Sequence, residues 1–111
     1  MRWALFLVLL LLGCQEKKER PKVNVKELVG IRGCPYCHDM RRPLLGPSFL
    51  DISKRYGPED LERIKESILK GSRGRWGEVA MPPQKVTEEE AELIAEWILE
   101  LKKQERRGSG R

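Results

Sequence analysis

Cys34-Pro35-Tyr36-Cys37-His38 is the stretch of this 111-residue chain on which the fold depends. Two thiols separated by two residues can reach the two vinyl groups on one edge of a porphyrin and form thioethers, and the residue that follows then lies under the iron. This spacing is the signature of c-type haem attachment. His38, the only histidine in the sequence, is the candidate proximal ligand. The motif therefore predicts one covalent haem c at Cys34 and Cys37.

A second iron ligand is needed for an electron carrier, and Met81 is the candidate. A thioether is a soft ligand for low-spin iron and raises its reduction potential. Met1 lies in the N-terminal apolar segment, and Met40 is too close to His38 to reach the opposite face of a porphyrin. The prolines that follow Met81 restrict the chain there. Taken alone, Met81 also fits a buried hydrophobic plug.

The N-terminus has the pattern of an export signal. Arg2 precedes an apolar run from Trp3 to Leu12, which is too short to span a bilayer because a membrane helix needs about 20 residues. Leu11-Leu12-Gly13-Cys14 resembles the lipobox of bacterial lipoproteins, in which the chain is cut before a cysteine that carries the lipid. We expect residues 1–13 to be a lipoprotein signal peptide and Cys14 the lipidation site; an ordinary signal peptide with a chance cysteine is the alternative.

The remaining segments follow from composition. Residues 14–22 are predicted to be the lipidated cysteine and a polar, flexible tether, residues 23–104 the folded domain, and residues 105–111 a disordered basic tail. The domain is small and 35% of the chain is charged, so its hydrophobic core is expected to be limited. Such a domain usually needs an additional stabilising element, such as a disulfide, a metal or a cofactor. This size excludes a large self-contained enzyme, and the single apolar run excludes a polytopic membrane protein.

The domain is predicted to be helical, because no stretch alternates with period two and four stretches carry apolar residues at helical spacing. Thr87 and Glu90 form a capping box at the start of the last of these stretches. Gly71 to Val86 contains three glycines and two prolines and is predicted to be a loop. The predicted helices are residues 23–33, 47–56, 58–70 and 87–101.

Together with further motifs, the haem motif resembles the pattern of small bacterial monohaem class I cytochromes c. The resemblance covers about residues 23–102. It implies an all-α class I cytochrome c fold, with about four short helices around one covalently bound haem. The motifs occur in the order and spacing of that family: Gly46-Pro47, Gly71-Ser72, Trp76-Gly77 and Met81-Pro82-Pro83.

The resemblance also implies residue roles. Cys34 and Cys37 would carry the thioethers, and His38 and Met81 would be the proximal and distal axial ligands. The carbonyl of Pro47 would accept a hydrogen bond from the His38 ring, which fixes its orientation and basicity. Trp76 would donate its indole N–H to a haem propionate, with a simple core aromatic as the alternative.

One position departs from the family pattern. Some relatives carry an arginine in the third helix that also holds a propionate, and Ser67 stands at the matching position here. Neutralisation of the propionates then falls to Arg73 or Arg75, or is absent.

The function that the resemblance implies is electron transfer without bond-making chemistry, so we do not expect an enzyme. The lipid would tether a monomeric carrier to the periplasmic face of a bacterial membrane, where a quinol-oxidising complex and a terminal oxidase or reductase are the expected partners. Lys54, Arg55, Arg73 and Arg75 are candidates for a basic rim that steers an acidic partner. Nucleic acid is not an expected partner, because the protein is exported and its charges are mixed.

Three other interpretations fit part of the pattern. Cys34-Pro35-Tyr36-Cys37 also occurs as the active site of glutaredoxins, but a thiol-disulfide oxidoreductase needs a strand before the motif and a β-rich scaffold with a cis-proline. A zinc module needs four ligands, and the sequence supplies only three in one cluster. A haem-based sensor would keep the haem but hold Met81 as a labile ligand.

Overall fold

The computed structural model describes residues 23–109. The expected signal peptide, the lipidation site Cys14 and the tether up to Lys22 lie outside the described residues. Within this part of the chain the elements are helices, and the only β-type pairings are two isolated bridges. The all-α prediction is therefore confirmed.

Side-chain caps explain where the first two α-helices begin. α2 (Val25–Ile31) starts after Asn24, whose side-chain oxygen accepts from the backbone N–H of Glu27 at 3.2 Å. α3 (Phe49–Arg55) starts after Ser48, whose hydroxyl accepts from the N–H of Asp51 at 3.0 Å. Such caps satisfy N–H groups that have no partner inside the helix.

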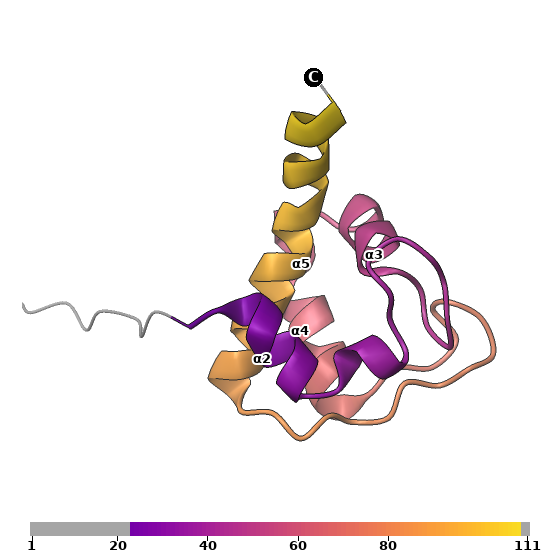
Figure 1. Cartoon of the computed structure of the whole chain (residues 1–111). Coiled ribbons are helices and arrows are strands. Elements are labelled where there is room, and N and C mark those ends of the chain that lie inside the picture. Colours follow the sequence, from indigo (N-terminus) through magenta and orange to yellow (C-terminus); the bar gives the residue numbers. More distant parts are fainter. Residues whose placement is uncertain (1–22, 110–111) are drawn as a thin grey trace, which may run out of the picture.

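A 3₁₀ turn, η2 (Pro58–Asp60), leads into α4 (Leu61–Lys70). Ile64 and Ile68, one turn apart on α4, are both buried, so this helix turns one apolar stripe inward. Gly71 ends it with φ +88°, a left-handed conformation that glycine adopts without strain. The long ordered segment that follows, residues 71–87, wraps around one side of the molecule (Figure 1).

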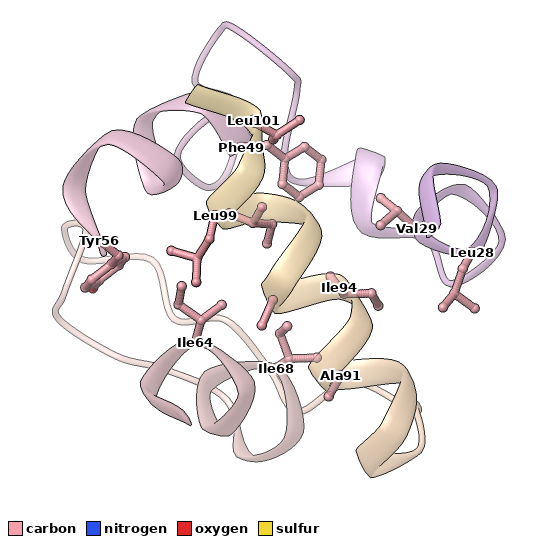
Figure 2. Packing of buried hydrophobic residues seen from close by; sticks show 12 residues of the cluster. Leu28, Val29, Phe49, Tyr56, Ile64, Ile68, Ala91, Ile94, Leu99 and Leu101 are labelled. Atoms are coloured by element: carbon pink, nitrogen blue, oxygen red, sulfur yellow. The ribbon is translucent and has the colours of Figure 1, made fainter. Parts of the chain in front are cut away.

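The last helix, α5 (Glu88–Ser109), is the central support of the fold. α2, α3 and α4 all pack against it, and the buried side chains of these helices converge on its inner face (Figure 2). The capping box is confirmed: Thr87 N–H donates to Glu90 Oε1 at 2.9 Å, and Glu90 N–H donates to Thr87 Oγ1 at 3.1 Å. The buried hydrophobic core comprises Leu28, Val29, Phe49, Tyr56, Ile64, Ile68, Ala91, Ile94, Ala95, Ile98, Leu99 and Leu101.

α5 also corrects an expectation. The disordered tail predicted for residues 105–111 is wrong for residues 105–109, because the helix continues to Ser109 and projects beyond the other helices (Figure 1). Residues 102–107 are strong helix formers, and Arg106 and Arg107 in the last turn complement the helix dipole. Glu105 in this extension pairs with Arg41 at 2.8 Å and Lys54 at 3.5 Å.

Candidate functional site

The Cys34–His38 motif forms a short turn directly after α2. Gly33 adopts φ +80° and starts the 3₁₀ turn η1 (Cys34–Tyr36). The carbonyl of Cys34 accepts from the N–H of Cys37 at 3.2 Å and of His38 at 3.0 Å. The two thiols are free and half-buried, and burial raises the pKa of the Cys34 thiol. The backbone thus holds both sulfurs and the imidazole within one turn.

The imidazole of His38 is held on several sides. Its Nδ1 lies 2.7 Å from the carbonyl oxygen of Pro47, and since a carbonyl can only accept, Nδ1 carries the proton. Phe49 lies against the ring with centroids 5.3 Å apart. The Nδ1–H tautomer leaves the lone pair of Nε2 available to a metal. The prediction for the Pro47 carbonyl agrees with this geometry.

Gly46 is a part of the site whose role the sequence analysis missed. A Cβ at this position would lie 2.6 Å from Cε1 and 2.9 Å from Nδ1 of the His38 ring, closer than real contacts allow. Only glycine therefore lets the chain pass this close to the imidazole. The sequence does contain a signal for this role, because Gly46 directly precedes Pro47, whose carbonyl is expected to accept a hydrogen bond from the His38 ring.

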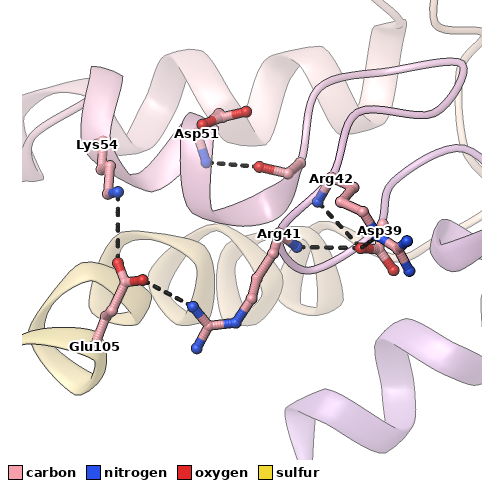
Figure 3. A network of polar contacts seen from close by, with 7 residues as sticks. Asp39, Arg41, Arg42, Asp51, Lys54 and Glu105 are labelled. Carbon is pink, nitrogen blue, oxygen red and sulfur yellow. Dashed lines mark hydrogen bonds and ion pairs between the residues drawn. The ribbon is translucent and has the colours of Figure 1, made fainter. Parts of the chain in front are cut away.

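The segment after His38 is tied to α3. The carbonyls of Asp39 and Met40 accept from the N–H groups of Phe49 and Leu50, at 2.9 and 3.1 Å. The Asp39 carboxylate accepts from the backbone N–H groups of the next two arginines (Figure 3), and these bonds hold its pKa below the ordinary value. The loop that follows His38 is therefore held by hydrogen bonds to α3 and within itself.

Met81 is held by the long loop on the other side. Its N–H and carbonyl exchange hydrogen bonds with the carbonyl and N–H of Ser72, at 2.8 and 3.0 Å. The N–H of Gln84 donates to the carbonyl of Ile68 at 2.9 Å, which ties the loop to α4. At Gly71 a Cβ would come within 2.7 Å of the Met81 carbonyl oxygen. Residues on both sides of Met81 therefore fix its backbone.

One cavity of about 410 Å³ brings the predicted residues together. Cys34, Cys37, His38 and Met81 all line it, although Met81 is distant from the motif in sequence. Most of its wall is apolar, from side chains of α3, α4, α5 and the long loop, including Phe49, Ile52, Tyr56, Ile64, Ile68, Val79, Ile94 and Ile98. An apolar cavity with two thiols, an imidazole nitrogen and a thioether suits a flat, largely apolar iron porphyrin.

Two of the three candidate propionate residues, Trp76 and Arg75, line this cavity. Trp76 lines the cavity and is 40% exposed. Ser67 and Arg75 also line it, whereas Arg73 does not. Two residues of the expected basic rim have other partners: Lys54 forms an ion pair with Glu105, and Arg55 stacks on the Trp76 ring.

Comparison with known proteins decides the family. The sequence matches no family model. It is 42% identical over 79 residues to cytochrome c-551 of Pseudomonas denitrificans, covering 69% of this chain and 96% of that protein. It is also 42% identical over 79 residues to cytochrome c-552 of Hydrogenobacter thermophilus, covering 69% and 81%. The chain belongs to the small class I cytochromes c.

The structural comparison agrees. The crystal structure of wild-type cytochrome c552 from Nitrosomonas europaea superposes on this cytochrome with a TM-score of 0.64 at 31% identity, covering 67% of this chain and 95% of that one. A deletion mutant of the same protein gives a TM-score of 0.66 at 32% identity, covering 68% and 98%. The class I cytochrome c fold predicted from the motifs is therefore confirmed.

Family membership settles the cofactor and the general function. A monohaem class I cytochrome c carries one covalently bound haem c and transfers electrons, and it is not an enzyme. No helix within residues 23–109 is both long and apolar enough to cross a membrane.

The structure also bears on two of the alternatives. A glutaredoxin-like scaffold does not fit, because the described residues form no strand and contain no cis peptide bond. The raised pKa of the Cys34 thiol is also the opposite of what an attacking thiol needs. A zinc module does not fit either, because no three His, Cys, Asp or Glu side chains within residues 23–109 are grouped as metal ligands.

Proposed function

We propose that this cytochrome is a membrane-tethered, extracytoplasmic single-electron carrier, with its haem held by Cys34, Cys37, His38 and Met81. The observation that supports this assignment is that these four side chains line one apolar cavity. When bound, the haem supplies reversible exchange of one electron between the ferrous and ferric states. The chain supplies attachment, axial ligation and exclusion of water.

The two cysteines would attach the cofactor. Each thiol would add across one vinyl group, with its sulfur bonding to one vinyl carbon and its hydrogen going to the other, and this addition would need no oxidant. The turn at Cys34 holds both thiols on the same short segment as His38. Attachment therefore also places the imidazole, whose Nε2 lone pair is free because Nδ1 donates to Pro47.

His38 and Met81, which line the same cavity, would be the two protein ligands of the haem iron. The imidazole is held by Pro47 and Phe49, and the methionine backbone is held by Ser72. Ligands held this firmly move little between oxidation states, which keeps the reorganisation energy of electron transfer small. The thioether of Met81 favours ferrous iron and so raises the reduction potential. In the same arrangement Trp76 would donate its indole N–H to a propionate.

The tether rests on the sequence alone. Lipidation at Cys14 would hold the carrier at the periplasmic face of a bacterial membrane, and residues 15–22 would reach about 15 Å as a coil. A tethered carrier searches a surface, which favours membrane-bound partners such as a quinol-oxidising complex and a terminal oxidase or reductase.

Optical spectroscopy tests the cofactor assignment. The full chain is produced in a host that matures c-type haem, and its dithionite-reduced and alkaline pyridine spectra are recorded for the wild type and for Cys34→Ala and Cys37→Ala. The wild type should give the pyridine spectrum of a haem with two thioethers, and each variant should give that of a haem with one thioether or a loss of attached haem. A wild-type chain without covalent haem would refute the assignment.

Fractionation tests the tether separately. The wild type should sediment with membranes and be released by detergent. A chain in which residues 1–14 are replaced by an ordinary cleavable signal peptide should appear in the soluble periplasmic fraction with its haem spectrum unchanged. Wild-type protein that is soluble without detergent would refute lipidation and leave the electron-carrier function standing.

A further inference from the structure

Arg63 and Arg75 line the cavity, Arg55 contacts the same loop, and none of the three forms an ion pair with another described residue. Arg63 extends from α4 and Arg75 from the long loop, and both line the cavity. Arg55, from α3, lies over the ring of Trp76. The ion pairs within residues 23–109 involve other arginines and lysines. Arg63 and Arg75 therefore place positive charge at the wall of a largely apolar cavity, and neither forms an ion pair within residues 23–109.

Arg75 is the arginine that the structure orients best. Its Nη1 donates to the Ser67 hydroxyl at 3.3 Å, and Ser67 in turn donates to the carbonyl of Arg63 at 3.0 Å. A hydroxyl positions a guanidinium but does not neutralise it, so the other N–H groups and the charge remain available. Arg73 lies two residues away and does not line the cavity.

Arg55 connects the two residues that precede Gly77. Its guanidinium carbon lies 4.4 Å from the centroid of the Trp76 ring, within the range of a cation–π contact. Its Nη1 donates to the backbone carbonyl of Arg75 at 2.7 Å. Tyr56 packs edge-on against the same indole, with ring centroids 6.4 Å apart. Arg55 thus contacts this exposed part of the loop twice, at the backbone carbonyl of Arg75 and at the side chain of Trp76.

We propose that Arg75, oriented by Ser67, is the cationic partner of a haem carboxylate, and that Arg55 is a positioning residue that holds Arg75 and Trp76 against it. This inference rests on the proposed function, because it requires the haem in this cavity. The carboxylates are the anionic side chains of the porphyrin and need a donor that is charged or polar. The cation would thus come from a loop, where some relatives use an arginine of the third helix and this chain has Ser67.

The charge has a predictable effect on the iron. A cation beside a carboxylate favours its ionised form, so the carboxylate stays ionised to lower pH. The cation also disfavours the extra positive charge of ferric iron, so its removal should lower the reduction potential. Arg63 from α4 and Arg75 from the loop are the charged side chains that line the cavity, and Arg55 from α3 contacts Arg75 and Trp76. The neighbouring loop residues Arg73 and Glu78 do not line it.

Potentiometric titration of the haem-loaded protein over a range of pH tests the proposal. Arg75→Gln should lower the potential at alkaline pH and move the pH at which the potential begins to rise on acidification toward neutrality. Arg55→Gln should shift both quantities in the same direction by less. Arg73→Gln removes the same charge from the same loop and should follow the wild type closely. Ser67→Ala leaves every charge in place and should give a small shift in the direction of Arg75→Gln.

The outcomes separate this proposal from the function it rests on. If Arg75→Gln keeps the wild-type spectrum but titrates like Arg73→Gln, the role of Arg75 is refuted and the electron-carrier function stands. If Arg75→Gln fails to retain haem, the Ser67→Ala and Arg55→Gln titrations decide, and wild-type curves for both refute the proposal. A wild-type chain that attaches no haem refutes the proposed function itself.

Discussion

The Nδ1 atom of His38 lies 2.7 Å from the carbonyl oxygen of Pro47, which can only accept a hydrogen bond. This single contact fixes the tautomer of the imidazole, orients its ring and leaves Nε2 as the nitrogen that can bind a metal. The contact depends on Gly46, because the chain passes too close to the ring for any side chain there. The backbone of the Gly46-Pro47 pair therefore shapes the proximal side of the site.

Gly46→Ala should disturb the histidine. The added Cβ would lie 2.6 Å from Cε1 of His38, so the ring or the loop must move. We expect the unfolding free energy of the haem-loaded protein to fall by about 1–3 kcal/mol, the usual cost of overpacking, and the reduced spectrum to change. Urea unfolding followed by haem absorbance measures the change in unfolding free energy.

Gly30→Ala is the matched control for that change. Gly30 lies in α2, and a Cβ there would meet nothing within 4 Å. It should leave the spectrum unchanged and raise stability by roughly 0.5–1 kcal/mol, because alanine is the better helix former. Equal effects from the two substitutions would contradict the packing argument.

Gly71→Ala should weaken the hold on Met81. Both Gly71 and Gly74 have positive φ, +88° and +78°, so alanine is strained at either position by about 1–2 kcal/mol. Only at Gly71 would the Cβ also press on the Met81 carbonyl oxygen, at 2.7 Å. Reduced Gly71→Ala should therefore bind carbon monoxide faster than Gly74→Ala does. Equal rates would show that the Met81 backbone does not depend on this contact.

The sequence predicted the parts of the site that have local signals. The spacing of Cys34 and Cys37 and the capping box at Thr87 are short-range patterns, and the structure shows the helices and turns expected there. The stacking of Arg55 on Trp76 joins residues that are far apart in sequence, and no periodicity reports such a pair. The helix beyond Leu101 was missed because its residues bury little apolar surface, and Glu105 instead links it to distant cations.

Substitution of Glu105 should loosen the end of α5. Its carboxylate pairs with Arg41 and Lys54, which join the helix end to the loop after His38 and to α3 (Figure 3). We expect Glu105→Gln to lower hydrogen-exchange protection after Leu101 and to cost about 0.2–1 kcal/mol per exposed pair. Glu100→Gln is the control, because Glu100 pairs with Lys103 of the same helix. If Glu105→Gln left hydrogen-exchange protection after Leu101 unchanged, the ion pairs of Glu105 would not stabilise the end of α5, and helix propensity alone would account for it.

Glu90 should make stability depend on pH. Its carboxylate accepts first from the Thr87 N–H and then from Arg32, and these bonds lower its pKa in the folded protein. A lowered folded pKa stabilises the protein above the unfolded pKa, and this contribution is lost as the pH falls through the folded pKa. Glu90→Gln should therefore be less stable than wild type at neutral pH and converge with it in acid.

Urea unfolding at a series of pH values measures this difference. Glu89→Gln serves as the control, because it changes the same charge in the same helical turn without touching Thr87 or Arg32. A constant offset between Glu90→Gln and wild type from neutral to acid pH would contradict the linkage.

In the proposed function His38 and Met81 ligate one haem that is attached at Cys34 and Cys37. The most direct test is the weak long-wavelength sulfur-to-iron band in the spectrum of the oxidised protein, compared between the wild type and Met81→Ala. We predict that the wild type shows the band and binds carbon monoxide poorly when reduced, and that Met81→Ala lacks the band, retains covalent haem and binds carbon monoxide readily. A wild-type protein without the band, or one that binds carbon monoxide as readily as Met81→Ala, would contradict the account and favour a sensor with a labile ligand.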